Sequence, residues 1–260
     1  MRIVMQNFKD KKADIELVYK VVNNLNLPMQ IYLPDNDAHN RQAILLIHGG
    51  GWNDAIKDNA PWDGGWMENN AKYFTQKGFI GITISYRSLT VSDQLNVGDL
   101  LADCVDAIKY IKTHLTFINF DNIIYMGDSA GGYLTTMLGL SQDDEIRPKS
   151  VISLNPVLGS LDSKWAYGFR NCEDIDNLTP SKMIGDKCAD FLFIHGTADK
   201  IVEMKYTEEL NDLLNIRGHR SKLIKIPDAE HAFILYDYKY SDEYVTNIME
   251  QIIEYINKNF

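Results

Sequence analysis

The stretch NIIYMGDSAGGYLTTMLGL, Asn122–Leu140, joins a short apolar run to a helix-like run through a turn of small residues. Its first part, NIIYMG, is nearly continuously apolar, which is typical of a strand buried on both faces of a sheet. Its last part, 130–140, has the length and composition of a helix. A strand that leads directly into a helix is the repeating unit of a parallel α/β sheet, so this stretch predicts that architecture.

The rest of the chain repeats this unit. Apolar runs predict further strands at AILLIH (Ala43–His48), FIGITIS, SVISLN, DFLFIH and KLIKIP, and helical patterns cover 69–77, 97–114, 203–216 and 242–257. Two earlier alternating segments, IELVYKVV and PMQIYL, predict antiparallel edge strands joined around 23–26. We therefore expect an α/β fold with a mostly parallel central sheet, antiparallel N-terminal edge strands and helices on both faces.

Length and composition are those of a globular protein. The chain has 260 residues, of which 45% are hydrophobic and 24% charged, and this is enough to bury a substantial core. We expect a single domain over 1–260, because no linker or repeat interrupts the pattern. The irregular stretches 53–67 and 156–183 are long for plain connections, which predicts active-site loop insertions at both.

The net charge and the cysteine content limit the kinds of binding partner and the cellular compartment that we expect. The formal net charge of −10 argues against binding nucleic acid or an anionic membrane. The first twenty residues lack the apolar core of a secretory signal, and no segment is apolar enough to span a bilayer. Three cysteines without metal-like spacing predict reduced thiols in a cytoplasmic protein. We expect no metal and no cofactor, because neither a ligand cluster nor a phosphate-binding loop is present.

GDSAGG contains the pattern G-x-S-x-G with Ser129 at its centre. Between a strand and a helix this pattern forces the serine into a tight turn where only small neighbours fit, and its hydroxyl projects above the sheet. The following helix N-terminus favours a developing negative charge. A glycine-rich turn with a capping serine would explain the hexapeptide without any chemistry. By itself, GDSAGG leaves both interpretations open.

The second motif, HGGGW, His48–Trp52, follows the predicted strand AILLIH. Consecutive glycines let backbone amides approach a ligand without a side chain in the way. An oxyanion formed by attack of Ser129 needs such preorganised donors. We therefore predict an oxyanion hole made by the amides of Gly50, Gly51 and Ala130. A merely flexible loop is the alternative interpretation of this motif.

A serine nucleophile needs a histidine base. In a sheet of this kind the chain order is serine, acid, histidine, so the base lies downstream of Ser129 at His195, His219 or His231. His231 follows the last predicted strand between small residues and is the preferred base. His219 lies in a charged turn and is expected to be solvated. His195 precedes the acid, so we interpret it as a packed histidine or one that supports the site indirectly.

The acid that orients this base is predicted to be Asp199, four residues after a strand end in HGTADK. Capping of the next helix is its alternative role. Asp190 begins its strand and would lie at the wrong end of the sheet. Glu230 adjoins His231 too closely in sequence to orient it, and Asp228 is the second choice.

The chain resembles α/β-hydrolases of the esterase and lipase group. The resemblance lies in HGGGW, SYR (Ser85–Arg87), GDSAGG, HGTAD and the late His231. The resemblance runs from about Ile31 to the C-terminus and includes hormone-sensitive-lipase-like esterases and bacterial feruloyl and acetyl-xylan esterase-like proteins. It implies a catalytic triad of Ser129, Asp199 and His231. Only 47 residues precede His48, which favours the carbohydrate-esterase branch. The segment SLTVSDQLNVGD and the long insertion 53–67 depart from the family pattern.

The expected function is therefore hydrolysis of short-chain acyl esters of small molecules, with acetylated or feruloylated oligosaccharides as a substrate class that the resemblance implies. Trp52, Trp62 and Trp66 beside the oxyanion loop, with Trp165 opposite, are predicted substrate contacts, although each would equally pack a loop. An arylformamidase, a peptidase-like hydrolase and a non-catalytic ligand-binding protein are the alternatives. The N-terminal strands would allow an oligomer, which the sequence does not decide.

Overall fold

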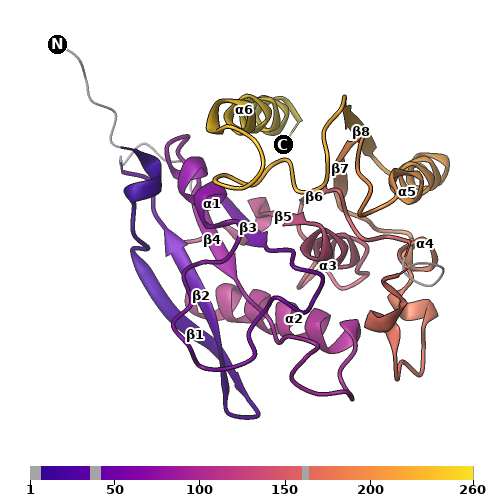
Figure 1. Ribbon diagram of the computed structural model, residues 1–260, viewed down its shortest axis with the longest axis horizontal. Helices are drawn as coiled ribbons and strands as arrows, with labels where there is room; N and C mark the ends of the chain where they lie inside the picture. Colours follow the sequence, from indigo (N-terminus) through magenta and orange to yellow (C-terminus); the bar gives the residue numbers. More distant parts are fainter. Residues whose placement is uncertain (1–6, 36–41, 160–163, 260) are drawn as a thin grey trace.

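The structure is a computed structural model that describes residues 7–35, 42–159 and 164–259. Within these residues the chain forms one eight-stranded sheet surrounded by helices (Figure 1). The strands are β1 (Ile15–Val22), β2 (Leu25–Tyr32), β3 (Ala43–Ile47), β4 (Ile80–Ile84), β5 (Ile124–Asp128), β6 (Ser150–Leu154), β7 (Asp190–Gly196) and β8 (Ser221–Ile226). The α-helices are α1 (Glu68–Thr75), α2 (Val97–His114), α3 (Ala130–Gly139), α4 (Pro180–Met183), α5 (Met204–Ile216) and α6 (Asp242–Asn259). Short 3₁₀ helices are η1 (Phe8–Asp10), η2 (Phe120–Asn122), η3 (Ala166–Phe169) and η4 (Asp176–Leu178).

The strand order across the sheet is β1-β2-β4-β3-β5-β6-β7-β8. Strands β1 and β2 are antiparallel to each other, and β2 is antiparallel to β4. From β4 to β8 every neighbouring pair is parallel. The carboxyl ends of β3, β5, β7 and β8 therefore lie along one edge of the sheet, where ligands bind in folds of this class.

Helices cover both faces of the sheet because its central strands are apolar on both sides. On β3, Leu45 and Ile47 pack with α2 and α3, whereas Ile44 and Leu46 pack with α1 and α6. Figure 1 shows these two helix pairs on opposite sides of the strands. The predicted mostly parallel sheet with antiparallel N-terminal strands and helices on both faces is thus confirmed.

Two predicted strands differ in their environment. We expected both N-terminal strands at the edge, but β2 lies inside the sheet because β4 pairs with its free side. KLIKIP was expected to be buried on both faces, but β8 is the other edge strand and Lys222 and Lys225 on it are exposed. Strand β8 pairs with β7 along one edge, and no described strand pairs with its other edge.

The two long connections have little regular structure. Residues 53–67 form turns joined to the core by an isolated bridge between Ile56 and Arg87. The segment 156–183 contains η3, η4 and the short α4, and its residues 160–163 lie outside the described residues. Among the residues that the structure describes, we find no helix with the length and hydropathy needed to span a bilayer.

Candidate active site

The turn after β5 holds Ser129 in a strained conformation. Its φ is 54° and its ψ is −113°, a region that residues with a side chain seldom adopt. The Ser129 amide donates to the Leu154 carbonyl at 2.9 Å, and its own carbonyl accepts from the Tyr133 amide at 3.1 Å. These bonds anchor the turn to β6 and α3. Strain retained in this way is characteristic of a functional position.

The glycines of GDSAGG are required by close backbone approach. A Cβ added to Gly127 would lie 2.3 Å from the Gly131 carbonyl oxygen, and one added to Gly131 would lie 2.0 Å from the Ile47 carbonyl oxygen. Real Cβ atoms do not approach backbone oxygens so closely. The motif therefore brings the start of α3 directly against the ends of β3 and β5, and Ser129 is raised above them.

We expect Gly131→Ala to lower the free energy of unfolding by about 3 kcal/mol, because the backbone of β3 cannot move away from the new methyl group. Chemical denaturation followed by circular dichroism measures this loss. Gly185→Ala is the matched control, since the atoms nearest to its Cβ would belong to the side chain of Gln142 rather than to backbone. Equal stability of the two variants would contradict the packing argument.

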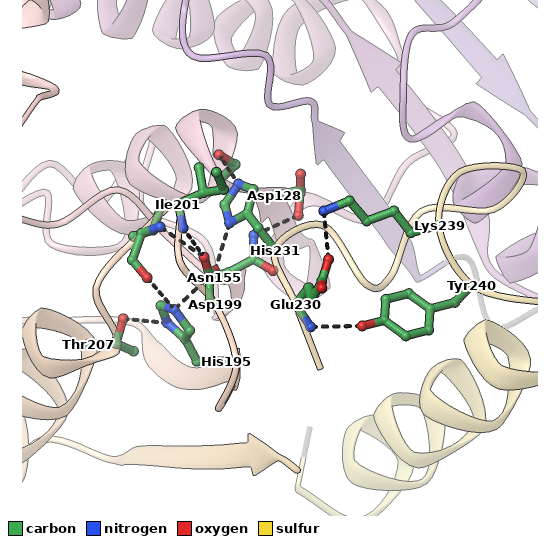
Figure 2. A network of polar contacts seen from close by, with 12 residues as sticks. Asp128, Asn155, His195, Asp199, Ile201, Thr207, Glu230, His231, Lys239 and Tyr240 are labelled. Carbon is green, nitrogen blue, oxygen red and sulfur yellow. Dashed lines mark hydrogen bonds and ion pairs between the residues drawn. The ribbon is translucent and has the colours of Figure 1, made fainter. Parts of the chain in front are cut away.

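The His231 ring connects Ser129 with Asp199. Figure 2 shows the His231 ring directed toward Asp199. Its Nε2 lies 2.8 Å from the Ser129 hydroxyl oxygen, and its Nδ1 lies 2.7 Å from Asp199 Oδ2. A carboxylate only accepts hydrogen bonds, so the Nδ1 carries the proton of the neutral ring. The Nε2 is then free to accept the proton of the Ser129 hydroxyl.

Asp199 is held rigidly in the turn after β7. Its Oδ1 accepts from the amides of Ile201 at 2.8 Å and Val202 at 2.9 Å, and its side chain has no solvent-exposed surface. Burial acts to raise the pKa of this carboxyl, but the hydrogen bonds from His195 and His231 outweigh it and hold the pKa well below its usual range. Helix α5 begins only at Met204, so Asp199 caps this turn rather than the helix.

His195 contacts the same carboxylate from within the core. Its Nε2 lies 3.3 Å from Asp199 Oδ2 and 3.2 Å from the Val202 carbonyl oxygen. Both neighbours are acceptors, so Nε2 carries the proton, and Nδ1 accepts from the Thr207 hydroxyl at 3.0 Å. Figure 2 shows Asp199 between the two histidine rings. The structure thus places His195 against the acid and away from Ser129.

The other acids and histidines considered from the sequence have different partners. Asp190 pairs with Arg220 at 2.6 Å at the start of β7, and the exposed Glu230 pairs with Lys239 at 3.3 Å. The Asp228 side chain is exposed. The His219 Nε2 lies 3.0 Å from the Gly185 carbonyl oxygen and the residue is half-buried, so this side chain is only partly solvated.

The HGGG loop lies at the same pocket as Ser129. Gly50 and Gly51 line the same pocket as Ser129 and His231. Within the described part of the chain, neither their amides nor that of Ala130 donates to a protein acceptor, and the Ala130 amide belongs to the unpaired first turn of α3. The Tyr86 hydroxyl donates to the His48 and Gly49 carbonyls at 2.9 and 3.2 Å. These contacts fix the loop in place.

The four predicted tryptophan contacts separate into different environments. Trp52 is fully buried, packs edge-on against Tyr133 and Phe169, and donates to the Ala130 carbonyl at 3.2 Å. This full burial makes its interpretation as a substrate contact wrong. Its φ of 62° lies in the left-handed region. Trp66 and Trp165 line the pocket beside Ser129. Trp62 lines a neighbouring cavity instead.

The pocket beside Ser129 has a volume of about 220 Å³. Its lining residues are Gly50, Gly51, Asp54, Trp66, Asp128, Ser129, Trp165, Ile201, His231, Ala232, Leu235 and Tyr238. No sequence pattern points to Asp54, Leu235 or Tyr238, because they come from irregular segments without a motif. The pocket is wide enough for a small acyl group and is partly apolar.

Asp128 is a further pocket residue that sequence reasoning passed over, although it lies inside GDSAGG. It is almost fully buried, and its Oδ1 accepts from the Asn155 side-chain Nδ2 at 2.9 Å. Burial raises its pKa, although nearby His231 and the Asn155 hydrogen bond act in the opposite direction. Asp128 therefore adds a second acidic group close to His231.

A comparison with protein families finds that the BD-FAE family model matches residues 29–162, about half of the chain. Among curated proteins, an alpha/beta hydrolase of Acanthamoeba polyphaga mimivirus is 22% identical over 168 residues, which cover 63% of this chain and 46% of the viral protein. The inactive dipeptidyl peptidase 10 of Rattus norvegicus is 26% identical over 241 residues, covering 88% of this chain and 30% of the peptidase homologue. The chain spans less than half the length of these relatives.

The solved structures that resemble this chain cover nearly its whole length. Apo esterase 2 of Thermogutta terrifontis superposes with a TM-score of 0.79 at 23% identity, covering 95% of this chain and 96% of that one. The same esterase with propionate bound gives a TM-score of 0.78 at 24% identity, covering 94% and 93%. At this identity the likeness shows a shared fold, and it confirms the α/β-hydrolase fold expected from the sequence.

Proposed function

Because the chain belongs to the BD-FAE family, we propose that it is a serine carboxylesterase that hydrolyses short-chain acyl esters. Ser129 is the nucleophile, His231 the general base and Asp199 the residue that orients it. The observation that carries this proposal is the His231 ring within 2.8 Å of the Ser129 hydroxyl and 2.7 Å of the Asp199 carboxylate. A nucleophile, base and orienting acid in this geometry are the requirements of acyl transfer.

The first half of the reaction forms an acyl-enzyme. His231 Nε2 removes the Ser129 proton as the hydroxyl oxygen attacks the ester carbonyl carbon, and Asp199 stabilises the resulting imidazolium through Nδ1–H. The oxyanion binds the amides of Gly50, Gly51 and Ala130. The tetrahedral intermediate then collapses, and the alcohol leaves with the proton held by His231.

The second half repeats these steps with water as the nucleophile. His231 takes a proton from water, the hydroxide attacks the acyl-enzyme carbonyl, and the same amides hold the second oxyanion. Collapse releases the acid and returns the proton to Ser129. No step needs a metal ion, because the base and the oxyanion donors come from the chain itself.

The pocket supports a short acyl group. Its volume of about 220 Å³ is below the range of drug-sized ligand sites, and Leu235, Trp165 and Ile201 supply apolar surface. The esterase of Thermogutta terrifontis was solved with propionate and with butyrate bound, which supports acyl groups of this size. Tyr238, which lines the pocket and is 51% exposed, offers aromatic surface for an alcohol such as an oligosaccharide.

Three wider proposals accompany this function. The chain acts as a single domain over 1–260, and the segments 53–67 and 156–183 contribute active-site walls through Asp54, Trp66 and Trp165. It works in the cytoplasm, which is supported by cysteines that are all free in the structure. Its partners are small-molecule esters rather than nucleic acids or membranes, in keeping with the net charge of −10.

A fluorophosphonate probe tests the proposed chemistry directly. We expect one probe per chain to react with Ser129, because a triad-activated serine attacks phosphorus as it attacks an ester carbonyl. Mass spectrometry of the labelled peptide locates the adduct. A protein that binds ligands without catalysis would remain unlabelled, and that result would remove the proposal.

A panel of substrates distinguishes a carboxylesterase from an arylformamidase or a peptidase. We compare release of acid from p-nitrophenyl acetate, from acetylated xylo-oligosaccharides and from feruloyl esters with turnover of N-formylkynurenine and of a dipeptidyl anilide. A higher kcat/KM for the esters supports the carboxylesterase. Preference for N-formylkynurenine or for the anilide would replace it with an arylformamidase or a peptidase on the same fold.

A further inference from the structure

A second chamber of about 350 Å³ adjoins the pocket beside Ser129. It is lined by His48, Asp54, Ala55, Ile56, Trp62, Asp63, Gly65, Trp66 and Ser85. Asp54 and Trp66 line both spaces, and the Trp66 indole N–H donates to Asp54 Oδ2 at 2.7 Å. This hydrogen-bonded pair therefore lies where the two spaces meet. Nothing in the proposed mechanism uses the second chamber.

The charge that lines the second chamber is negative. Asp54 and Asp63 both line it, and no Lys or Arg is among its lining residues. Within the described part of the chain, neither carboxylate has an ion-pair partner: Asp54 accepts from Trp66, and Asp63 accepts from the Gly65 amide at 3.2 Å. The chamber thus presents two uncompensated carboxylates to any group that enters it.

The one basic residue in the wall, His48, does not supply a compensating charge. Its Nδ1 lies 2.9 Å from the Gly49 carbonyl oxygen and its Nε2 lies 2.8 Å from the Ser85 hydroxyl. Burial lowers the pKa of His48, although the Gly49 hydrogen bond and the charges of Asp54 and Asp63 act in the opposite direction. The ring is therefore neutral near pH 7 and fixed between its partners.

The remaining wall of the chamber is aromatic. Trp62 is half-buried and Trp66 is 47% exposed, so both indoles offer surface to a ligand. Tryptophan is the side chain whose ring face attracts cations most strongly. Two indoles beside two carboxylates favour an organic cation over a neutral or anionic group, since both surfaces attract positive charge.

The sheet order decides which part of an ester reaches this chamber. His48 and Ser85 follow β3 and β4, on one side of the β5 turn that carries Ser129. His231 follows β8 and approaches Ser129 from the other side. The leaving alcohol must receive its proton from His231, so it departs on that side. The predicted oxyanion hole takes the carbonyl oxygen, so the acyl group is left to extend past Asp54 and Trp66, which line both the pocket and the second chamber.

We propose that the second chamber binds an ammonium group carried at the far end of the substrate's acyl chain. This inference rests on the proposed esterase function and narrows its substrate class to esters of short acids that bear a cationic amine. The carboxylates of Asp54 and Asp63 supply the attraction, and the indoles of Trp62 and Trp66 enclose the cation. Anionic acyl groups are disfavoured at the same place.

Three p-nitrophenyl esters with one leaving group test the charge preference. The acyl groups are 4-(trimethylammonio)butanoyl, its neutral isostere 5,5-dimethylhexanoyl, and the anionic glutaryl group. At low ionic strength we expect kcat/KM to be about fivefold to tenfold higher for the cationic ester than for the neutral one, because two solvent-exposed charge pairs each contribute modestly. The anionic ester should be slowest, and about 0.5 M NaCl should reduce both differences.

Asp63→Asn is the diagnostic variant, because Asp63 lines the second chamber but not the pocket beside Ser129. We expect the cationic-to-neutral ratio to fall by about threefold. Asp58→Asn is the matched control: this exposed aspartate lies on the same loop but outside the chamber, and its ratio should equal that of the unmodified protein. A ratio of one in the unmodified protein, or a ratio unchanged by Asp63→Asn, would overturn the proposal.

A binding measurement keeps this inference separate from the proposed function. Butyltrimethylammonium is titrated into the protein and tryptophan fluorescence is followed, which requires no hydrolysis. We expect saturable quenching that Asp63→Asn weakens and Asp58→Asn does not. If the cation binds in this way but no ester is hydrolysed, the esterase proposal fails and the cation site stands. If esters are hydrolysed and the cation does not bind, the cation site fails alone.

Discussion

Replacement of Ser129 by alanine is expected to lower kcat/KM for p-nitrophenyl acetate by at least about 10⁴-fold. The hydroxyl is the atom that forms the bond to the acyl carbon, so its removal leaves only direct attack by water, aided by the amides of Gly50 and Gly51. Because the other parts of the site remain, the residual rate should still exceed that of the uncatalysed reaction. Initial rates measured by p-nitrophenolate absorbance give the comparison.

The Ser129→Ala variant should keep its fold. The strained backbone at this position is anchored by bonds from its amide and carbonyl, and neither involves the side chain. Thermal unfolding should therefore occur within a few degrees of the unmodified protein. Ser141→Ala, beyond the end of α3, is the matched control and should retain full activity. Hydrolysis by Ser129→Ala at the rate of this control would show that another residue is the nucleophile.

Replacement of Asp199 by asparagine is expected to lower kcat by about 10⁴-fold with a much smaller change in KM. The asparagine amide can donate to His231 Nδ1, which would place the ring proton on Nε2, facing Ser129. The histidine could then no longer accept the hydroxyl proton. The variant also loses the negative charge that stabilises the imidazolium formed during attack. Steady-state kinetics with p-nitrophenyl butyrate separate kcat from KM.

A control for this variant comes from the opposite end of the same strand. Asp190 pairs with Arg220 at the start of β7, far from the carboxyl edge where Asp199 lies. We expect Asp190→Asn to change kcat less than about threefold, because a partly exposed ion pair contributes little and does not touch the site. If both substitutions reduced kcat to the same extent, loss of strand stability rather than loss of the orienting charge would account for the effect.

Much of the fold follows from local patterns in the sequence. Helix α2 has the predicted bounds, Val97–His114, because its apolar stripe is long and Asn96 and Asp99 form a capping box at its start. Strand β3 was recognisable because a strand covered on both faces must be apolar at every position. The small residues of GDSAGG and HGGGW mark where backbones approach each other, which only glycine permits.

The candidate catalytic residues could be selected from the sequence for a related reason. In a parallel sheet, the carboxyl ends of the strands share one edge, so motifs after β3, β5, β7 and β8 must converge even though up to 102 positions separate Ser129 from His231. This convergence predicts which residues are near each other. Their catalytic roles stay a prediction until the variants are measured.

The tertiary structure decided what depends on neighbours distant in the chain. Trp52 and Trp66 follow similar loop residues, yet one is buried against Tyr133 and Phe169 and the other is 47% exposed. Strand β2 lies inside the sheet only because β4 pairs with it. The contact of His195 with Asp199 and the chamber beside the Ser129 pocket likewise arise from packing between elements. Local sequence patterns indicate whether a residue prefers to be buried. The residues that bury it are determined only when the strands and loops pack together.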